Sequence, residues 1–168
     1  MESVTELLSQ IKNGDRKSIA KAITLVESKK AEDRKLADEL LSSLPKANNN
    51  SLRIGISGPP GVGKSTFIEA IGQKIISENE RLAILAVDPS SSINGGSILG
   101  DKTRMDVLSK AEETFIRPSP SSGKLGGVGH ATKDSIQILE SAGFSVILIE
   151  TLGVGQAETN FLDMTDIF

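Results

Sequence analysis

The segment that most constrains the fold is residues 58–66, whose sequence GPPGVGKST matches the pattern G-x-x-x-x-G-K-[ST]. A short apolar run precedes it and a helix-forming stretch follows it, which is the context that a phosphate-binding loop requires. Glycines let backbone N–H groups turn toward phosphate oxygens, and the positive end of the following helix attracts the same negative charge. The pattern therefore predicts a nucleotide site made of Gly58, Pro59, Pro60, Gly61, Val62, Gly63, Lys64, Ser65 and Thr66.

Two residues of this loop have separate expected roles. The Lys64 ammonium reaches the β- and γ-phosphates and offsets charge during hydrolysis, which makes Lys64 a predicted catalytic residue. The Ser65 hydroxyl is expected to ligate Mg²⁺. The alternative is a glycine-rich turn of purely structural use, which does not require a strand before it and a helix after it.

After residue 51 the chain alternates between short apolar runs and helical stretches. Continuous apolar runs predict strands buried on both faces, and their alternation with helices predicts a parallel sheet covered by helices. The expected fold class is therefore α/β, a P-loop nucleotide hydrolase with a mostly parallel sheet. The expected strands are residues 53–57, 82–87, 114–116 and 145–149, and the expected helices are residues 64–78, 103–111 and 131–142.

The N-terminal quarter of the chain predicts a small helical arm, because its apolar residues recur at helical spacing up to residue 44. A turn sequence before Asp15 ends one helix, and Asp15 can cap the next. The polar stretch after Pro45 is typical of a linker. We therefore expect a helical arm at residues 1–47 and a P-loop nucleotide hydrolase domain at residues 52–168.

Composition narrows the partners and the compartment. The chain has 19 Lys and Arg against 22 Asp and Glu, a formal net charge of −3, which favours neither a nucleic acid nor a membrane surface as partner. It has no cysteine, which excludes disulfides and thiolate metal sites. No stretch approaches the roughly 18 apolar residues of a membrane span, and no secretory signal pattern opens the chain. A cytoplasmic protein is expected.

Carboxylates at the ends of apolar runs are candidates for a magnesium site, since the ion must neutralise charge on the transferring phosphoryl group. Glu150 and Asp88 each end such a run. Asp101 lies in a glycine-bearing segment and is a third candidate, with an exposed loop residue as the alternative. The expected magnesium ligands, direct or through water, are Ser65, Asp88, Asp101 and Glu150.

The glycine-bearing stretch that follows the last apolar run is expected to respond to a γ-phosphate. Gly153 or Gly155 offers a backbone N–H to the phosphate. Gln156 is a candidate for positioning the attacking water and is the second predicted catalytic residue, with a solvated loop side chain as the alternative. The glycine-rich residues 117–130 predict a functional loop without regular structure, and His130 at its end is interpreted as a capping or surface residue.

Five segments together carry a resemblance to a known family: GPPGVGKST at 58–66, AVDPSSS at 86–92, GGSILGDKTRM at 95–105, FIRPSPSSGKLGGVG at 115–129 and ILIETLGVGQAE at 147–158. They resemble the GTPase chaperones of methylmalonyl-CoA mutase, also named ArgK/MeaB-like proteins and LAO/AO transport-system ATPases. The resemblance implies a GTPase of the signal-recognition-particle and MinD-like class, which uses Mg²⁺, gates cobalamin loading and protects a cobalamin-dependent mutase. It also implies that Lys64, Ser65 and Thr66 bind phosphates and magnesium, with Asp88, Asp101 and Glu150 as the magnesium-site acids.

Members of that family continue into further strands, a guanine-reading Asn-Lys-x-Asp loop and a C-terminal dimerising arm. We expect these parts to be absent here, which leaves a sheet truncated at its C-terminal side, without the homodimer of full-length relatives. An exposed sheet edge of this kind is expected to make the protein marginally stable or prone to aggregate. No [NT]-K-x-D pattern occurs in the chain, so a preference for guanine over adenine follows from the resemblance alone.

Three functions remain open from the sequence. The first is GTP binding and hydrolysis, with GTP and GDP as ligands, in support of a cobalamin-dependent acyl-CoA mutase. The second is a fragment that binds phosphate weakly and acts only by interaction. The third is a P-loop kinase of a transport system. Turnover of GTP separates the first from the second, and phosphate transfer to an added acceptor identifies the third.

Overall fold

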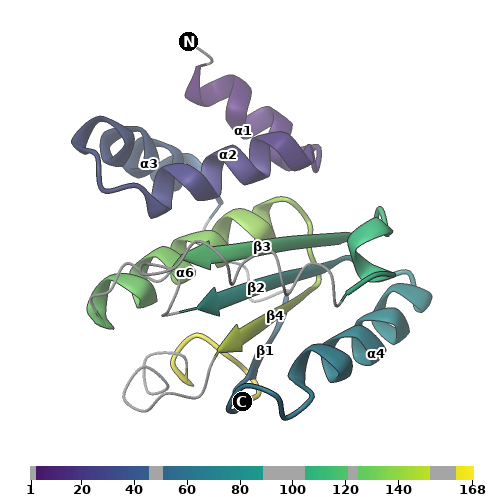
Figure 1. The fold of residues 1–168 in the computed structure, drawn as a ribbon. Helices are drawn as coiled ribbons and strands as arrows, with labels where there is room; N and C mark the ends of the chain where they lie inside the picture. The colour runs from purple at the N-terminus through teal and green to yellow at the C-terminus, as the bar shows by residue number, and fades with distance from the viewer. Residues whose placement is uncertain (1–2, 46–50, 89–104, 121–124, 152–161) are drawn as a thin grey trace.

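The computed structural model describes residues 3–45, 51–88, 105–120, 125–151 and 162–168, and only the backbone of Asp88, Pro120 and residues 125–128. Three N-terminal helices come first: α1 (Val4–Lys12), α2 (Arg16–Glu27) and α3 (Ala31–Ser43). Strands and helices then alternate (Figure 1): β1 (Leu52–Ile56), α4 (Lys64–Ser77), β2 (Leu82–Asp88), the 3₁₀ helix η2 (Leu108–Lys110), β3 (Thr114–Pro120), α6 (Leu125–Ser141) and β4 (Val146–Thr151).

The four described strands form one parallel sheet in the order β1-β4-β2-β3. All six residues of β4 are buried, as expected for a central strand of a parallel sheet covered on both faces. The carboxyl ends of the strands therefore meet at one edge, here called the carboxyl edge, and the strand starts form the amino edge. The predicted α/β fold with a parallel sheet is confirmed.

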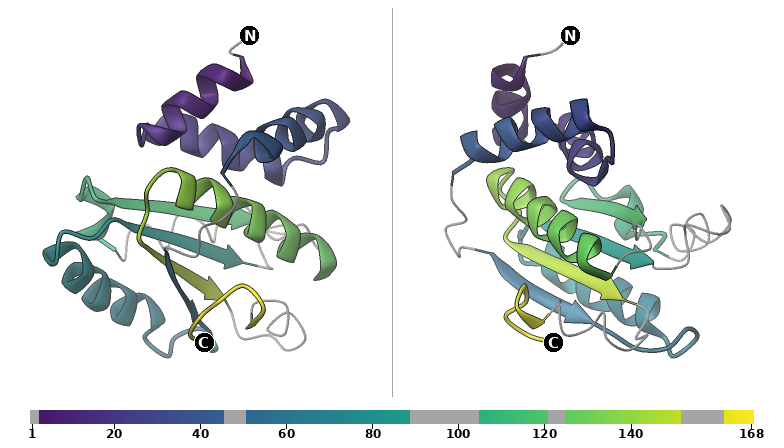
Figure 2. Two further views of the ribbon diagram at one scale, coloured as in Figure 1. Left: turned by 180° about the vertical axis from the view of Figure 1, so that it is seen from behind. Right: turned by 90° about the vertical axis from the view of Figure 1, so that its left-hand side faces the viewer.

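The sheet lies between layers of helices (Figure 2), and alternate residues of its strands pack against different layers. In β4, Val146 and Leu148 belong to the core that contains Ile68 of α4, whereas Ile147 and Ile149 belong to the core shared with α6 and the N-terminal helices. Successive side chains of a strand point to opposite faces. One face of the sheet is thus covered by α4 and the other by α6, with the N-terminal helices stacked beyond α6.

The N-terminal helices begin at capping residues, as their sequence predicts. Ser3 and Glu6 form a capping box at the start of α1. The Asp15 carboxylate accepts a 2.7 Å hydrogen bond from the Ser18 N–H at the start of α2, which confirms the predicted cap. Fully buried side chains such as Ile19 and Ile23 join the core on the α6 face. The proposed linker at residues 46–50 lies outside the described residues.

The prediction of a helix at residues 103–111 is wrong for the described part of that segment, residues 105–111, in which the only helix is η2. The fully buried Met105 and Leu108 lie three residues apart, so one tight turn is enough to bury both. Leu108 then packs directly over Gly72 of α4, where a longer side chain would collide with it.

The prediction that residues 117–130 lack regular structure is also wrong, because β3 continues to Pro120 and α6 begins at Leu125. Pro118 and Pro120 have no N–H, yet they are tolerated because β3 is the outer strand of the described sheet, next to β2. His130 is exposed near the start of α6, in agreement with its interpretation as a surface residue.

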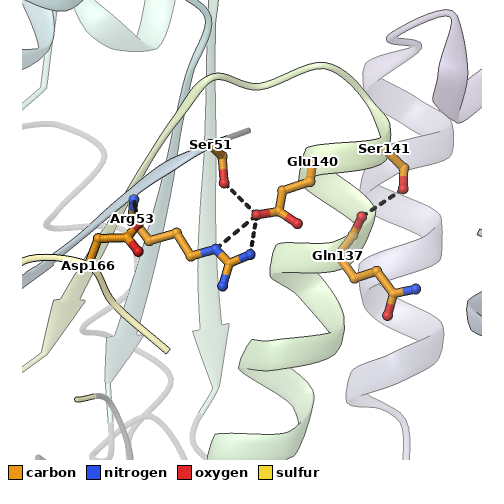
Figure 3. Close-up of polar contacts among 6 residues, drawn as sticks. All are labelled: Ser51, Arg53, Gln137, Glu140, Ser141 and Asp166. Atoms are coloured by element: carbon orange, nitrogen blue, oxygen red, sulfur yellow. Dashed lines mark hydrogen bonds and ion pairs between the residues drawn. The ribbon is translucent and has the colours of Figure 1, made fainter. Parts of the chain in front are cut away.

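At the amino edge a buried carboxylate ties α6 to β1, and we call Ser51, Arg53 and Glu140 the amino-edge clamp. Figure 3 shows Glu140 pointing from α6 toward Arg53 of β1 and toward Ser51, which directly precedes that strand. Its Oε1 accepts hydrogen bonds from Arg53 Nε at 2.8 Å, from Arg53 Nη2 at 2.6 Å and from the Ser51 hydroxyl. The side chains of Arg53 and Glu140 are only 19% and 9% exposed.

The last described segment, residues 162–168, lies along the outer side of β1. The Asp166 carboxylate accepts a 2.8 Å hydrogen bond from the Arg53 N–H, and Ile167 forms a parallel bridge with Ile54. The Phe168 ring occupies the space beside Gly55 in which a Cβ would lie. None of the helices within the described part of the chain is long and apolar enough to cross a membrane.

Candidate functional site

The phosphate-binding loop connects β1 to α4 at the carboxyl edge of the sheet. Gly61 and Gly63 have φ angles of 83° and 96°, a conformation that side chains with a Cβ rarely adopt. A Cβ at either position would meet no described atom within 4 Å. Glycine is therefore required at these two positions by the backbone conformation and not by close packing.

The start of α4 is shaped for an anion. Its N-cap is Gly63, which has no side chain to bond the N–H groups of the first helical turn. Those N–H groups and the helix dipole together favour negative charge at this end. The loop and helix thus present backbone donors where the sequence predicts phosphates.

Lys64 folds back across the loop that precedes it. Its Nζ donates to the Gly58 carbonyl at 2.7 Å and to the Pro59 carbonyl at 3.2 Å, and the residue is only 9% exposed. Within the described residues its ammonium forms no ion pair. Neutral carbonyls orient the charge without neutralising it, so the charge remains available to a phosphate.

Glu150 supplies a buried carboxylate on the strand next to β1. It pairs in register with Ile56, the last residue of β1, and is 7% exposed. Because strand side chains alternate, Glu150 lies on the same face as Leu148, which is the face covered by α4. The carboxylate therefore lies on the side of the sheet from which Ser65, half-buried in the first turn of α4, also comes.

These residues fit a magnesium ion in kind, since a hydroxyl and a carboxylate are the hard oxygen donors that Mg²⁺ takes. Asp88 ends β2 in register with Pro120, at the same edge of the sheet. The predicted residues Asp101, Gly153 and Gln156, together with Lys102 and Arg104, lie outside the described residues. Among the described residues, no three His, Cys, Asp or Glu side chains lie close enough together to hold a metal ion.

Sequence reasoning missed a second clamp, at the carboxyl edge. Glu27, the last residue of α2, accepts hydrogen bonds from Arg117 and Ser119 of β3. Glu27 and Arg117 are 90 residues apart in the chain, and no local pattern links an acid at a helix end with an arginine in a distant strand. No sequence signal could have identified this pair.

Comparison with known proteins identifies the family. The family model described as "Methylmalonyl Co-A mutase-associated GTPase MeaB" matches residues 19–168. "Probable GTPase Rv1496" of Mycobacterium tuberculosis is 52% identical over 167 residues, which cover 99% of this chain and 50% of that protein. GTPase ArgK of Escherichia coli is 46% identical over 166 residues, with coverage of 99% and 50%.

A solved structure shows the same fold. The crystal structure of an LAO/AO transport system kinase superposes with a TM-score of 0.79 at 37% identity and covers 97% of this chain and 47% of that one. The chain spans about half the length of the curated relatives it matches. With its phosphate-binding loop, its parallel sheet and a family match over residues 19–168, the chain belongs to the MeaB family of methylmalonyl Co-A mutase-associated GTPases.

Proposed function

We propose that this chain binds GTP with Mg²⁺ and hydrolyses the bond to the γ-phosphate. The observation that carries the proposal is the position of Lys64. Its ammonium is held by the carbonyls of Gly58 and Pro59 in the loop before α4, and α4 covers the face of the sheet that also carries the buried Glu150 carboxylate. A cation and a carboxylate arranged around a helix N-terminus are the elements that phosphoryl transfer requires.

Each residue has a distinct part in this proposal. The backbone N–H groups of residues 61–66 surround the phosphate oxygens, and Lys64 offsets negative charge on the β- and γ-phosphates. Bound Mg²⁺ would supply neutralisation of the charge that develops on the transferred group. Ser65 and Glu150 would hold the ion, with Asp88 and Asp101 as further ligands. Gly153 and Gln156 would contact the γ-phosphate and orient the attacking water.

Guanine specificity and the partner are supported by the family rather than by described side chains. The relatives are named GTPases, and the family is named for its association with methylmalonyl-CoA mutase. We therefore infer that the nucleotide is GTP and that the partner is a cobalamin-dependent acyl-CoA mutase, whose cobalamin loading the protein assists. Co-elution of the chain with a purified methylmalonyl-CoA mutase, with GDP and with a non-hydrolysable GTP analogue, tests the partner directly.

The nucleotide proposal is tested by the fluorescence of mant-GTP and mant-ATP, with and without Mg²⁺, followed by phosphate release from GTP. We expect magnesium-dependent binding of mant-GTP that exceeds binding of mant-ATP, and slow turnover. Equal weak binding of both nucleotides would instead indicate a phosphate site without base recognition, and no binding would leave only an interaction role.

A transport-system kinase is the second candidate, because the solved structure that superposes on this chain is named as one. A kinase would transfer the γ-phosphoryl group to an acceptor instead of water. Labelled γ-phosphate that appears on an added amino acid or protein, and not as free phosphate, would favour this candidate over hydrolysis.

A further inference from the structure

The carboxyl edge of the sheet is tied to the N-terminal helices by one carboxylate, and we call Glu27, Arg117 and Ser119 the carboxyl-edge clamp. Arg117 Nη2 donates to Glu27 Oε2 and also, at 3.1 Å, to the Thr24 hydroxyl of α2. The Ser119 hydroxyl donates to Glu27 Oε1 at 2.5 Å. Each carboxylate oxygen therefore holds a different residue of β3, so the strand is fixed at two points.

The clamp is buried. The side chains of Arg117 and Glu27 are 20% and 9% exposed, and the clamp joins α2 to β3, two elements that are in contact. Loss of one partner of a buried ion pair leaves the other charge desolvated and uncompensated, which costs far more than loss of a surface pair. Glu27 and Arg117 therefore hold each other in one arrangement.

The clamp acts where β3 has the least support of its own. Two of the last three residues of the strand are prolines, Pro118 and Pro120, and a proline contributes no N–H to the ladder. Between them, Ser119 pairs in register with Val87, and Pro120 pairs with Asp88. The position of the end of β3 is therefore set in part by α2, and the neighbouring strand end is that of Asp88.

We propose that Glu27 is a positioning residue for the magnesium side of the nucleotide site. It fixes the end of β3 and, through the β2–β3 register, the backbone at Asp88, a proposed magnesium-site acid. The N-terminal helices thereby tune the magnesium dependence of nucleotide binding. This inference rests on the proposed function, because it assigns a further residue to the same site.

The amino-edge clamp provides a matched control. Glu140 holds an arginine and a serine two residues apart, just as Glu27 does, and the exposures of the two ion pairs are nearly equal. It lies at the opposite edge of the sheet from the phosphate-binding loop. Glu27→Ala and Glu140→Ala therefore remove comparable buried contacts and differ in their position relative to the nucleotide site.

The measured quantity is the ratio of the mant-GTP Kd without Mg²⁺ to the Kd with Mg²⁺, at a temperature at which circular dichroism shows each variant to be folded. We expect Glu27→Ala to reduce this ratio about fivefold, a typical coupling between sites, and Glu140→Ala to leave it unchanged. Glu27→Gln is expected to restore most of the ratio, since its amide can accept from Arg117 and still bond Ser119.

Equal ratios for folded Glu27→Ala and Glu140→Ala would overturn the inference. If Glu27→Ala does not fold, the same Kd ratio is compared between Ser119→Ala and Ser51→Ala, which each remove one hydrogen bond to a clamp glutamate. We expect Ser119→Ala to reduce the ratio and Ser51→Ala to leave it unchanged. A wild-type chain without magnesium-dependent nucleotide binding would refute the proposed function and the inference together. Magnesium-dependent binding by the wild type, with an unchanged Kd ratio in the Glu27 and Ser119 variants, would refute the inference but not the proposed function.

Discussion

The two outer strands of the sheet are each held by a glutamate from a helix, at opposite ends. At the amino edge, Glu140 Oε1 accepts the hydrogen bonds from both Ser51 and Arg53. The other carboxylate oxygen, Oε2, is buried without a hydrogen-bond partner among the described residues. At the carboxyl edge, Glu27 divides its donors between both oxygens. The same three residue types thus make a single-point contact in one place and a two-point contact in the other.

The surroundings of the two clamps explain why this difference matters. β1 is also held on its outer side by residues 166 and 167, whose N–H groups both donate to the Arg53 carbonyl. Among the described strands, β3 pairs with β2 alone, and it carries two prolines at its end. We therefore expect loss of either clamp to destabilise the fold, but only changes at the carboxyl edge to alter ligand binding as well.

The largest expected effect on stability is that of Glu140→Ala. It removes the partner of Arg53 in a buried ion pair and is expected to lower the free energy of unfolding by about 3–5 kcal/mol, with nucleotide affinity unchanged. Urea denaturation measures the loss. The control is Glu78→Ala, which removes an exposed i,i+4 pair with Lys74 and is expected to cost under about 0.5 kcal/mol. If both variants lost the same free energy of unfolding, burial of the ion pair would not determine the cost of breaking it.

Lys64→Ala is the complementary change at the carboxyl edge. A charge-assisted contact contributes about 1.5–3 kcal/mol, so nucleotide affinity is expected to fall about a hundredfold at the upper end of that range. The free energy of unfolding should change by only about 1 kcal/mol, because the lost bonds reach loop carbonyls. Titration with mant-GTP tests this, with Lys74→Ala, an exposed lysine of the same helix, as control. An affinity that survives would exclude Lys64 from the phosphate site.

Gly72→Ala tests the packing of α4 near the amino edge. A Cβ there would lie 2.5 Å from Leu108 Cδ1 and 3.0 Å from Leu82 Cδ2, and overpacking of this kind costs about 1–3 kcal/mol. The gain in helix propensity, about 1 kcal/mol, offsets part of that cost. Thermal unfolding should show a net loss that Leu108→Val partly rescues. A variant more stable than the wild type would show that Leu108 can move aside.

The smallest expected effect concerns Asp134 of α6. Glu140 of the same helix is paired with Arg53, whereas Asp134 forms no ion pair among the described residues. Burial raises the pKa of the Asp134 carboxyl, and Arg34 and His130 oppose that shift only in part. A raised pKa in the folded state means that protonation favours folding, so this contribution is present at low pH and is lost as pH rises through the folded pKa.

Asp134→Asn should therefore make the protein slightly more stable than the wild type at about pH 7. The difference should be smaller at about pH 4, because the wild-type carboxyl, whose pKa is raised by burial, takes up its proton as the pH falls. Urea denaturation of both proteins at the two pH values measures this change. A difference that grows as the pH falls would show that Arg34 outweighs the burial of Asp134.

The parts of the structure that the sequence predicts well are those with local causes. The cap at Asp15, the loop at residues 58–66 and the strand that contains Glu150 each follow from a few neighbouring residues. The errors arose where distant contacts outweighed local preference. The glycine content of residues 117–130 argued against regular structure, yet β3 continues to Pro120, because a strand at the outside of the described sheet tolerates the prolines there.

The sequence by itself determined the phosphate-binding loop, the parallel α/β class and the family, because these depend on motifs and periodicities within short stretches. Only the tertiary structure decided the strand order and the two clamps, which join residues 87 and 90 positions apart. The physical reason is that a buried charge must be paired with whichever opposite charge the fold brings next to it. The residues adjacent to it in the sequence do not indicate which distant residue that is.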